Sequence, residues 1–155
     1  MAKDQADELR QVMQRLFRQF GALAVDMTPC GKPLSIAHAH ALMVLLGRGE
    51  LPQQELGTEL SIDKSNVARL CAKMVEAGHA EQRPSNDDGR SRIVSLTSHG
   101  KRLAREVDAA SHARFGAWLE ALPPGRRSQL IDGLNQLLAA IDVMRARSVD
   151  ERAAR

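Results

Sequence analysis

The stretch that decides the fold, residues 51–100, reads LPQQELGTELSIDKSNVARLCAKMVEAGHAEQRPSNDDGRSRIVSLTSHG. Its spacing predicts a short helix over 53–60, a turn, and a second helix over 64–77. Two strands over 79–83 and 92–96 follow, separated by a loop rich in turn-forming residues. A helix pair followed by a basic hairpin supplies a rod that fits the major groove of DNA and an arm for the adjacent minor groove. This order of elements favours DNA binding.

Further helices are predicted on both sides of this stretch. Apolar residues recur every three or four positions over 4–28, and a segment rich in Pro and Gly ends that pattern. A second helix over 36–46 has Ser35 as its N-cap. After the hairpin, apolar stripes predict two helices within 98–147, which are separated at Pro123-Pro124-Gly125. The expected fold class is therefore mainly α (α+β).

These elements predict a winged helix-turn-helix lobe over 34–100. Within it, the helix-turn-helix covers about 51–77 and the wing covers 79–96. The flanking helices, 4–28 and 98–147, have apolar stripes wider than one small core requires. Pairing with a second copy of the chain would bury this surplus, so we expect the flanking helices to dimerise.

The composition is that of an ordinary globular protein: 155 residues, 43% hydrophobic, 26% charged, with a formal net charge of +3. This length suits one domain, so residues 1–155 are expected to form a single domain. The sequence has no apolar run of membrane-spanning length and no N-terminal signal core. Its two cysteines, Cys30 and Cys71, are too few for a disulfide framework. We therefore expect a cytoplasmic protein without a membrane partner.

Motifs of catalysis and cofactor binding are missing from the sequence. It contains no G-x-S-x-G elbow, P-loop, H-E-x-x-H pair or Rossmann glycine pattern. Aromatic residues make up only 3% of the chain, which argues against a stacking platform for single-stranded nucleic acid. We therefore expect neither an enzyme nor a bound cofactor.

The helix pair has an apolar side and a polar side. The residues predicted to face inward and join the two helices are Leu56, Leu60, Ile62, Val67, Leu70, Cys71 and Met74. The polar residues left on the open face are Lys64, Ser65, Asn66, Arg69 and Lys73. Asn can bond adenine and Arg can bond guanine, whereas Ser and Lys suit phosphates. A merely solvated helix face is the alternative interpretation.

The hairpin carries a second group of candidate DNA contacts. Arg83, Arg90 and Arg92 cluster around its turn, and Asp88 lies two residues before Arg90. A carboxylate at that position can hold a guanidinium in a fixed orientation. An oriented arginine at a hairpin tip suits the negative potential of a narrow minor groove. The alternative is a turn whose charges only keep it soluble.

At these residues the chain resembles the multiple-antibiotic-resistance regulator (MarR) family. The motifs that carry the resemblance are Leu34-Ser35, SNVARL at 65–70, EAGHA at 76–80, Arg83, and DGRSRIVSLTSHG at 88–100. The last of these matches the family pattern Asp-x-Arg followed by Leu-Thr-x-x-Gly. The resemblance covers essentially the whole chain. Ala68 departs from it, because members often have Ser or Thr there.

The resemblance implies a triangular homodimer that places recognition helices in successive major grooves of a pseudo-palindromic operator and wings in the minor groove. Carried over residue by residue, it indicates Ser65, Asn66 and Arg69 on the recognition helix, and Arg90 braced by Asp88 on the wing. It also implies a repressor that releases double-stranded DNA when a small phenolic or lipophilic acid binds.

The effector cleft implied by the resemblance would lie between the flanking helices and the DNA-binding lobe. The residues expected to line it are Phe17, Met27, His38, Met43 and Phe115. The same residues could equally be ordinary core, because apolar residues at helical spacing are core more often than pocket. The sequence identifies no ligand.

Three alternatives to a DNA-binding repressor with a small-molecule effector remain open. Cys30 could be an oxidisable thiol, although the chain has no Tyr and only Lys32 nearby to activate it. Zinc is the second alternative; its candidate ligands are Asp26, Cys30, His38, His40, Asp108 and His112. His38 and His40 point to different sides of a helix, so at most one could join a given site, and no metal is expected. The third is a winged-helix interaction module that does not bind DNA.

Overall fold

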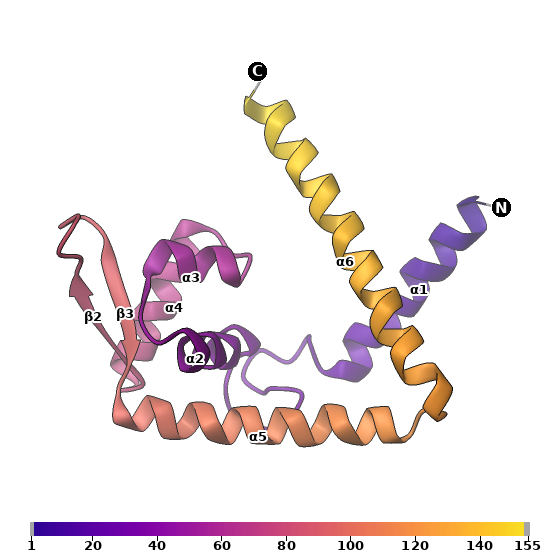
Figure 1. The fold of residues 1–155 in the computed structure, drawn as a ribbon, viewed down its shortest axis with the longest axis horizontal. Helices are drawn as coiled ribbons and strands as arrows, with labels where there is room; N and C mark the ends of the chain where they lie inside the picture. The colour runs from indigo at the N-terminus through magenta and orange to yellow at the C-terminus, as the bar shows by residue number, and fades with distance from the viewer. Residues whose placement is uncertain (1, 154–155) are drawn as a thin grey trace. The chain divides into compact units, whose positions relative to one another are not determined.

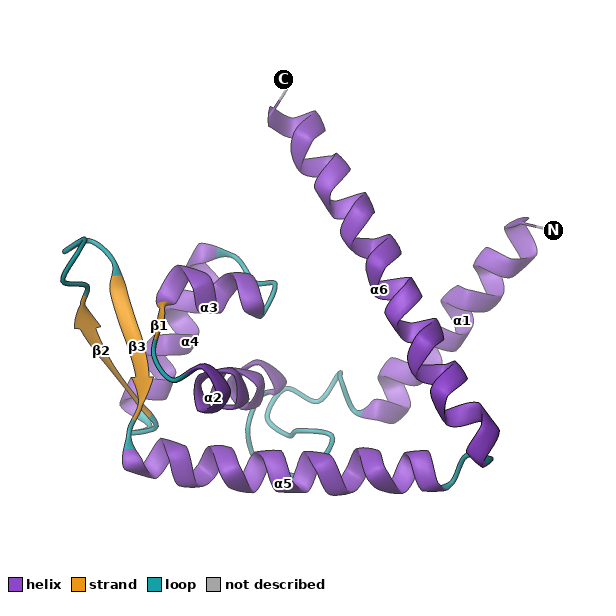
Figure 2. Cartoon of the chain, viewed as in Figure 1, coloured by secondary structure: helices purple, strands orange, loops and turns teal. Residues whose placement is uncertain are grey.

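The computed structural model describes residues 2–153 and confirms the mainly α fold class (Figure 1). Helices dominate the chain, and a small antiparallel sheet combines one short strand between the second and third helices with two strands between the fourth and fifth (Figure 2). The elements are α1 (Ala2–Phe20), α2 (Ile36–Arg48), β1 (Leu51–Pro52), α3 (Gln53–Glu59), α4 (Lys64–Glu76), β2 (Ala80–Pro84), β3 (Arg92–Leu96), α5 (Ser98–Glu120) and α6 (Pro124–Ala153).

The first helix is shorter than predicted, because α1 ends at Phe20 rather than near Thr28. Gly21 adopts the left-handed conformation with φ +82°, which favours glycine. The amide of Ala22 then bonds the carbonyl of Phe17 over 3.0 Å, and the Gly21 amide bonds that of Arg18 over 3.3 Å. This pair of bonds is a Schellman motif, which closes the helix well before the prolines.

The sheet has three strands, where the sequence predicted two. In the order β1-β3-β2, both pairings are antiparallel, with Leu51 opposite Val94 and Ala80 opposite Leu96. Strand β2 also begins and ends one residue later than predicted. A two-residue strand that contains Pro52 has no alternation to detect, which explains why β1 was missed.

A tight turn joins α3 to α4 in the helix-turn-helix. Ser61 has φ 54°, an uncommon value for a residue other than glycine, and the Ile62 amide bonds the Gly57 carbonyl over 3.0 Å. A Cβ on Gly57 would lie 3.1 Å from the Val67 side chain. The two helices therefore cross closely, and the angle between them is fixed by packing.

The core lies between α2, the helix-turn-helix, the sheet and the start of α5. Its largest fully buried side chains are Leu42, Leu45, Leu56, Val67, Cys71, Met74, Val94 and Val107. Gly100 explains how α5 joins this core: a Cβ there would meet the His79 carbonyl oxygen at 1.8 Å. The glycine of the Leu-Thr-x-x-Gly pattern thus allows α5 to approach the turn that links α4 to the wing.

Two compact units divide the chain; the first ends at His112 and the second begins at Ala113. Helix α5 runs through this boundary. Helix α6, in the second unit, continues to Ala153, beyond the predicted end at residue 147. Among the described residues, no helix is long and apolar enough to cross a membrane. The single domain over 1–155 stays a prediction.

Candidate nucleic-acid interface

Helix α4 presents its polar residues on an open face, as predicted. Lys64, Ser65, Asn66, Arg69 and Lys73 are all exposed. The predicted inward residues take the opposite side: Leu56, Val67, Leu70, Cys71 and Met74 are buried, and Leu60 and Ile62 are partly buried. Packing of the apolar side thus holds the polar side toward solvent.

Asp63 organises the first turn of α4. It is the N-cap, and its Oδ1 accepts hydrogen bonds from the Asn66 amide over 2.8 Å and from Ser65 Oγ over 2.9 Å. Its Oδ2 accepts a further bond from Asn66 Nδ2 over 2.7 Å. Asn66 Oδ1 in turn accepts from Arg69 Nη2 over 2.5 Å. This chain of hydrogen bonds therefore orients three side chains that are candidates for contacting DNA, Ser65, Asn66 and Arg69.

The charge on Asp63 is favoured by these contacts. Above all, the bond from the Asn66 amide lowers the pKa of the Asp63 carboxyl, and the bond from the Ser65 hydroxyl adds to this. Sequence reasoning assigned Asp63 only to a turn. Its position just before an apolar-periodic helix is typical of an N-cap and was the signal available to find it.

A hollow beside α4 adjoins the same polar residues. This cavity of about 410 Å³ is bordered by Asn66, Arg69 and Lys73 from α4, and by Ser35 and Ala37 from the start of α2. Two of its bordering side chains are cationic. The arrangement suits a polyanion that follows the edge of the α4 face.

On the wing, Asp88 makes a different contact from the one expected. Its Oδ1 accepts a hydrogen bond from the backbone amide of Arg90 over 3.0 Å, which shapes the turn. The expected ion pair with the Arg90 guanidinium is not among those formed by residues 4–151. Arg90 and Arg92 are both exposed. The carboxylate therefore fixes the backbone that carries Arg90 and leaves the guanidinium free to meet a ligand.

Arg83 is engaged with a residue outside the wing. Its Nη2 lies 2.8 Å from Oε1 of Glu50, just before β1, and both side chains are about half exposed. Exposed pairs of this kind contribute little to stability. This ion pair can exchange for a phosphate contact at little cost.

The structure places the expected effector-cleft residues in different surroundings. Phe17 and Met27 are exposed by 48% and 45%, and Met43 packs against the core of the first unit. His38 is buried in the same unit. Phe115 belongs to the second unit. A cleft that joins all five stays a prediction.

His38 lies in a group of three histidines that the sequence did not predict. Its Nε2 is 3.0 Å from Nδ1 of His79, whose ring centroid is 5.0 Å from that of His99. Burial lowers the pKa of His38 to about 4, and the charges of His79 and Lys73 act in the same direction. His38 is therefore neutral at pH 7.

The thiol and zinc candidates have few suitable neighbours. Cys30 is partly buried, with its Sγ 3.1 Å from Thr28 Oγ1. The ammonium of Lys32, two residues away in the sequence, pairs with Glu106 over 3.3 Å. Within the described part of the chain, no three His, Cys, Asp or Glu side chains form a group that could hold a metal ion. The candidates Cys30, His38, Asp108 and His112 are therefore not assembled into a site.

A helix-turn-helix with a polar recognition face and a basic hairpin defines a winged-helix DNA-binding protein. The profile of the MarR family matches residues 32–91. The HTH-type transcriptional regulator YfiV of Bacillus subtilis is 26% identical over 109 residues, which is 70% of this chain and 68% of the relative.

Solved structures share the fold over a larger part of the chain. The PcaV transcriptional regulator of Streptomyces coelicolor, in complex with its natural ligand, has a TM-score of 0.68 and 17% identity, and covers 86% of this chain and 90% of its own. Streptococcus pneumoniae FabT, in complex with DNA, has a TM-score of 0.69 and 15% identity, over 93% of this chain and 99% of its own.

These matches show that the chain is similar to transcriptional regulators of the MarR family, whose profile matches residues 32–91, and that it shares the winged-helix fold of the solved regulators. Proteins of this family regulate transcription and are not enzymes.

Proposed function

We propose that this protein is a homodimeric repressor that recognises a pseudo-palindromic operator through α4 and the wing. The observation that carries the proposal is the Asp63–Asn66–Arg69 chain of hydrogen bonds on the exposed face of α4. These side chains are held in place before any ligand arrives, which reduces the entropy lost when they bind base edges.

The residues proposed to contact DNA have distinct roles. Asn66 and Arg69 read base edges, whereas Lys64, Ser65 and Lys73 bind phosphates. On the wing, Arg90 enters the minor groove with Asp88 holding its backbone, while Arg83 and Arg92 contact the flanking phosphates. Arg83 must leave Glu50 to do so.

Dimerisation is supported by apolar side chains that lie exposed on two helices. On α6 they are Leu130, Ile131, Leu134, Leu138, Ile141 and Met144, and on α1 they are Leu9, Val12, Leu16 and Phe17. Apolar stripes of this length are costly to leave in water. A second copy of the chain would cover them and place two recognition helices on one face of the DNA, which fits an inverted-repeat operator.

Release of DNA by a small-molecule effector is the mechanism that we propose for regulation. The ligand-bound PcaV structure, which shares this fold, supports it. The predicted cleft residues Phe17, Met27, His38, Met43 and Phe115 stay the proposed binding region. A regulator of this kind acts in the cytoplasm, where it meets double-stranded DNA.

A mobility-shift titration on fragmented genomic DNA tests DNA recognition directly. The wild type should select a subset of fragments, and its affinity should fall steeply with salt. The double variant Asn66→Ala/Arg69→Ala should lose the selection but keep weak binding to all fragments. Arg102→Ala, an exposed change on α5, is the matched control and should behave as the wild type. Wild-type protein that binds no fragment at low salt would support an interaction module instead.

A further inference from the structure

His79 lies where α4, the wing and α5 meet. Its amide donates to the Met74 carbonyl over 2.9 Å, which closes the last turn of α4, and its carbonyl accepts from the Thr97 amide over 3.1 Å. The Thr97 hydroxyl donates to the Gly78 carbonyl over 2.6 Å and accepts from the Gly100 amide over 3.0 Å. We refer to Gly78, His79, Thr97 and Gly100 as the wing joint. Its backbone fixes where α4 ends and where the wing begins.

His38 supports the wing joint from α2. Its Nε2 lies 3.0 Å from Nδ1 of His79, and the two residues are exposed by only 8% and 9%. At this distance one ring donates an N–H and the other accepts it, which requires at least one unprotonated nitrogen. Loss of either partner would leave a buried ring nitrogen without a hydrogen bond, which is costly. The pair therefore ties α2 to the wing joint.

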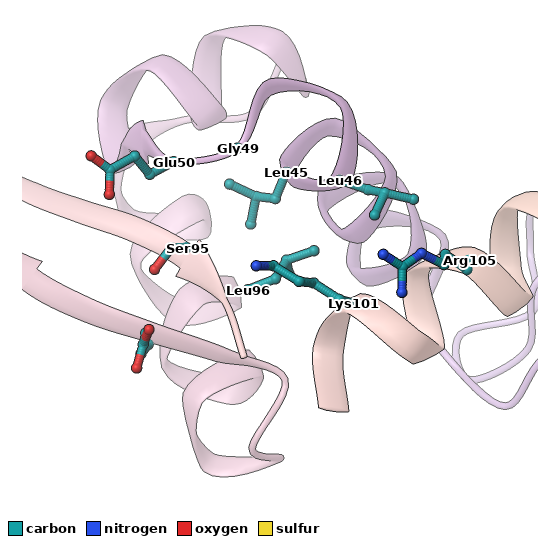
Figure 3. Close-up of a pocket in the computed structure, with 9 residues that line it drawn as sticks. Leu45, Leu46, Gly49, Glu50, Ser95, Leu96, Lys101 and Arg105 are labelled. Atoms are coloured by element: carbon teal, nitrogen blue, oxygen red, sulfur yellow. The ribbon is translucent and has the colours of Figure 1, made fainter. Parts of the chain in front are cut away.

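Packing beside the wing joint is incomplete. A cavity of about 450 Å³ lies between the end of α2, strands β2 and β3, and the start of α5 (Figure 3). It is bordered by Glu81, two residues after His79, and by Lys101, which follows Gly100. Figure 3 shows the Lys101 side chain reaching into its middle. The wing joint thus has room to move away from α2 once the histidine pair breaks.

The surroundings of the histidine pair oppose positive charge. Burial lowers the pKa of both rings; Lys73 from α4 acts in the same direction on His38, and His99 from α5 acts so on His79. Helix α3 and strand β3 also pack against α2, but they contribute no charge that acts on His38. Among the described residues, no carboxylate acts on either ring. The pair is therefore stable in its neutral form and weakened by protonation.

We propose that His38 and His79 are positioning residues for DNA recognition, whose hydrogen bond holds the end of α4 and the base of the wing in the arrangement that fits an operator. The inference rests on the proposed function, because it is measured as operator affinity. Protonation of both rings makes both facing nitrogens donors and breaks the bond. Acid therefore weakens operator binding, whereas added positive charge alone would strengthen binding to any DNA.

The test compares a neutral buffer, about pH 7.5, with an acid buffer, about pH 5.5. The full-length protein is titrated with the duplex that it selects from random sequences in neutral buffer, and with an unrelated duplex of equal length. We expect selected-duplex affinity to fall about tenfold in acid, because an opened joint frees a histidine of ordinary pKa, about 6.5. Affinity for the unrelated duplex should hold or rise. Circular dichroism in both buffers verifies that the helices remain.

Variants separate the hydrogen bond from the charge. His38→Gln can donate to or accept from His79 but does not titrate, so its affinity should match the wild type in neutral buffer and change less than about twofold in acid. His38→Leu removes the bond and should bind about tenfold more weakly in both buffers. His112→Gln, an exposed change outside the histidine pair, is the matched control and should keep the wild-type profile. If His38→Leu does not fold, the profile of His38→Gln decides.

Selected-duplex affinity that holds or rises in acid would overturn the inference. A His38→Gln profile that falls as steeply as that of the wild type would also overturn it, because the titrating group would then lie elsewhere. Loss of helical dichroism in acid would assign the weaker binding to global unfolding and contradict a local joint. A wild type that selects no duplex in neutral buffer would contradict the proposed function, and this inference with it.

Discussion

Arg69 donates a hydrogen bond from Nη2 to Oδ1 of Asn66 over 2.5 Å on the exposed face of α4. Asn66 in turn donates from Nδ2 to Asp63 over 2.7 Å. The two proposed base readers are thus oriented by each other and by a carboxylate that DNA need not touch. Asp63 is therefore a positioning residue, and its contribution to DNA affinity can be measured separately from its role as a helix cap.

Asp63→Ala should weaken operator binding about tenfold and lower the melting temperature by a few degrees, because it removes both the cap and the contact with Asn66. Asp63→Ser is the matched control: serine also caps helices, so stability should largely return while affinity stays low. The two quantities are measured by thermal unfolding and by fluorescence anisotropy on operator DNA. Full recovery of operator affinity in Asp63→Ser would show that Asp63 acts only as the N-cap of α4.

Arg90→Ala should weaken operator binding strongly and leave the melting temperature unchanged, because Arg90 is exposed at the tip of the wing. Asp88→Ala should act in the same direction with a smaller effect, because it frees the backbone turn at Arg90. Arg102→Ala again serves as the exposed control. Equal operator affinity for the wild type and Arg90→Ala would show that the wing does not reach the DNA.

Lys73 and Arg69 should differ in their salt dependence. Lys73→Ala removes a phosphate contact, so it should weaken binding to every sequence and reduce the slope of log affinity against log salt by about one. Arg69→Ala should cost about 1–3 kcal/mol and relax the choice of one base pair. Titrations at several salt concentrations, on operator and single-substitution duplexes, distinguish the two. An unchanged slope in Lys73→Ala would mean that this lysine faces only solvent.

The free energy of unfolding should fall as the pH drops from about 6.5 toward 4. The pKa of His38 is lowered to about 4 in the folded protein by burial, His79 and Lys73, so the unfolded chain takes up a proton first. The stability contributed by neutral His38 is fully present above pH 6.5. The loss in free energy of unfolding can reach a few kcal/mol at the acid end of this range. Urea unfolding at a series of pH values measures it. His38→Gln should flatten the dependence, and a slope identical to that of the wild type would contradict the assignment.

The sequence predicted features that depend on local periodicity and missed those that depend on contacts between distant segments. The open face of α4 and the buried side opposite it follow from the spacing of apolar residues around Val67 and Leu70. The pair Arg83–Glu50 joins residues 33 apart, and His38–His79 joins residues 41 apart. No sequence pattern indicates such contacts.

Two errors of the sequence reading were local. The end of the first helix was assigned to the proline-rich segment, although Gly21 provides an earlier left-handed stop. Asp88 was expected to hold the guanidinium of Arg90, but it accepts a hydrogen bond from the backbone amide of Arg90 instead. An aspartate in a turn commonly bonds the amide two residues later. In both cases the backbone conformation determined the structure: the end of the helix in one and the partner of Asp88 in the other.

We propose that two copies of the chain together recognise DNA in a sequence-specific manner. Selection from a pool of random duplexes by the full-length protein, followed by sequencing of the bound fraction, tests it most directly. We predict enrichment of an inverted repeat whose half-site centres lie about one DNA turn, roughly 10 base pairs, apart. The same selection with Asn66→Ala/Arg69→Ala should yield no such repeat. A bound pool from the wild type with no enriched sequence would contradict the account.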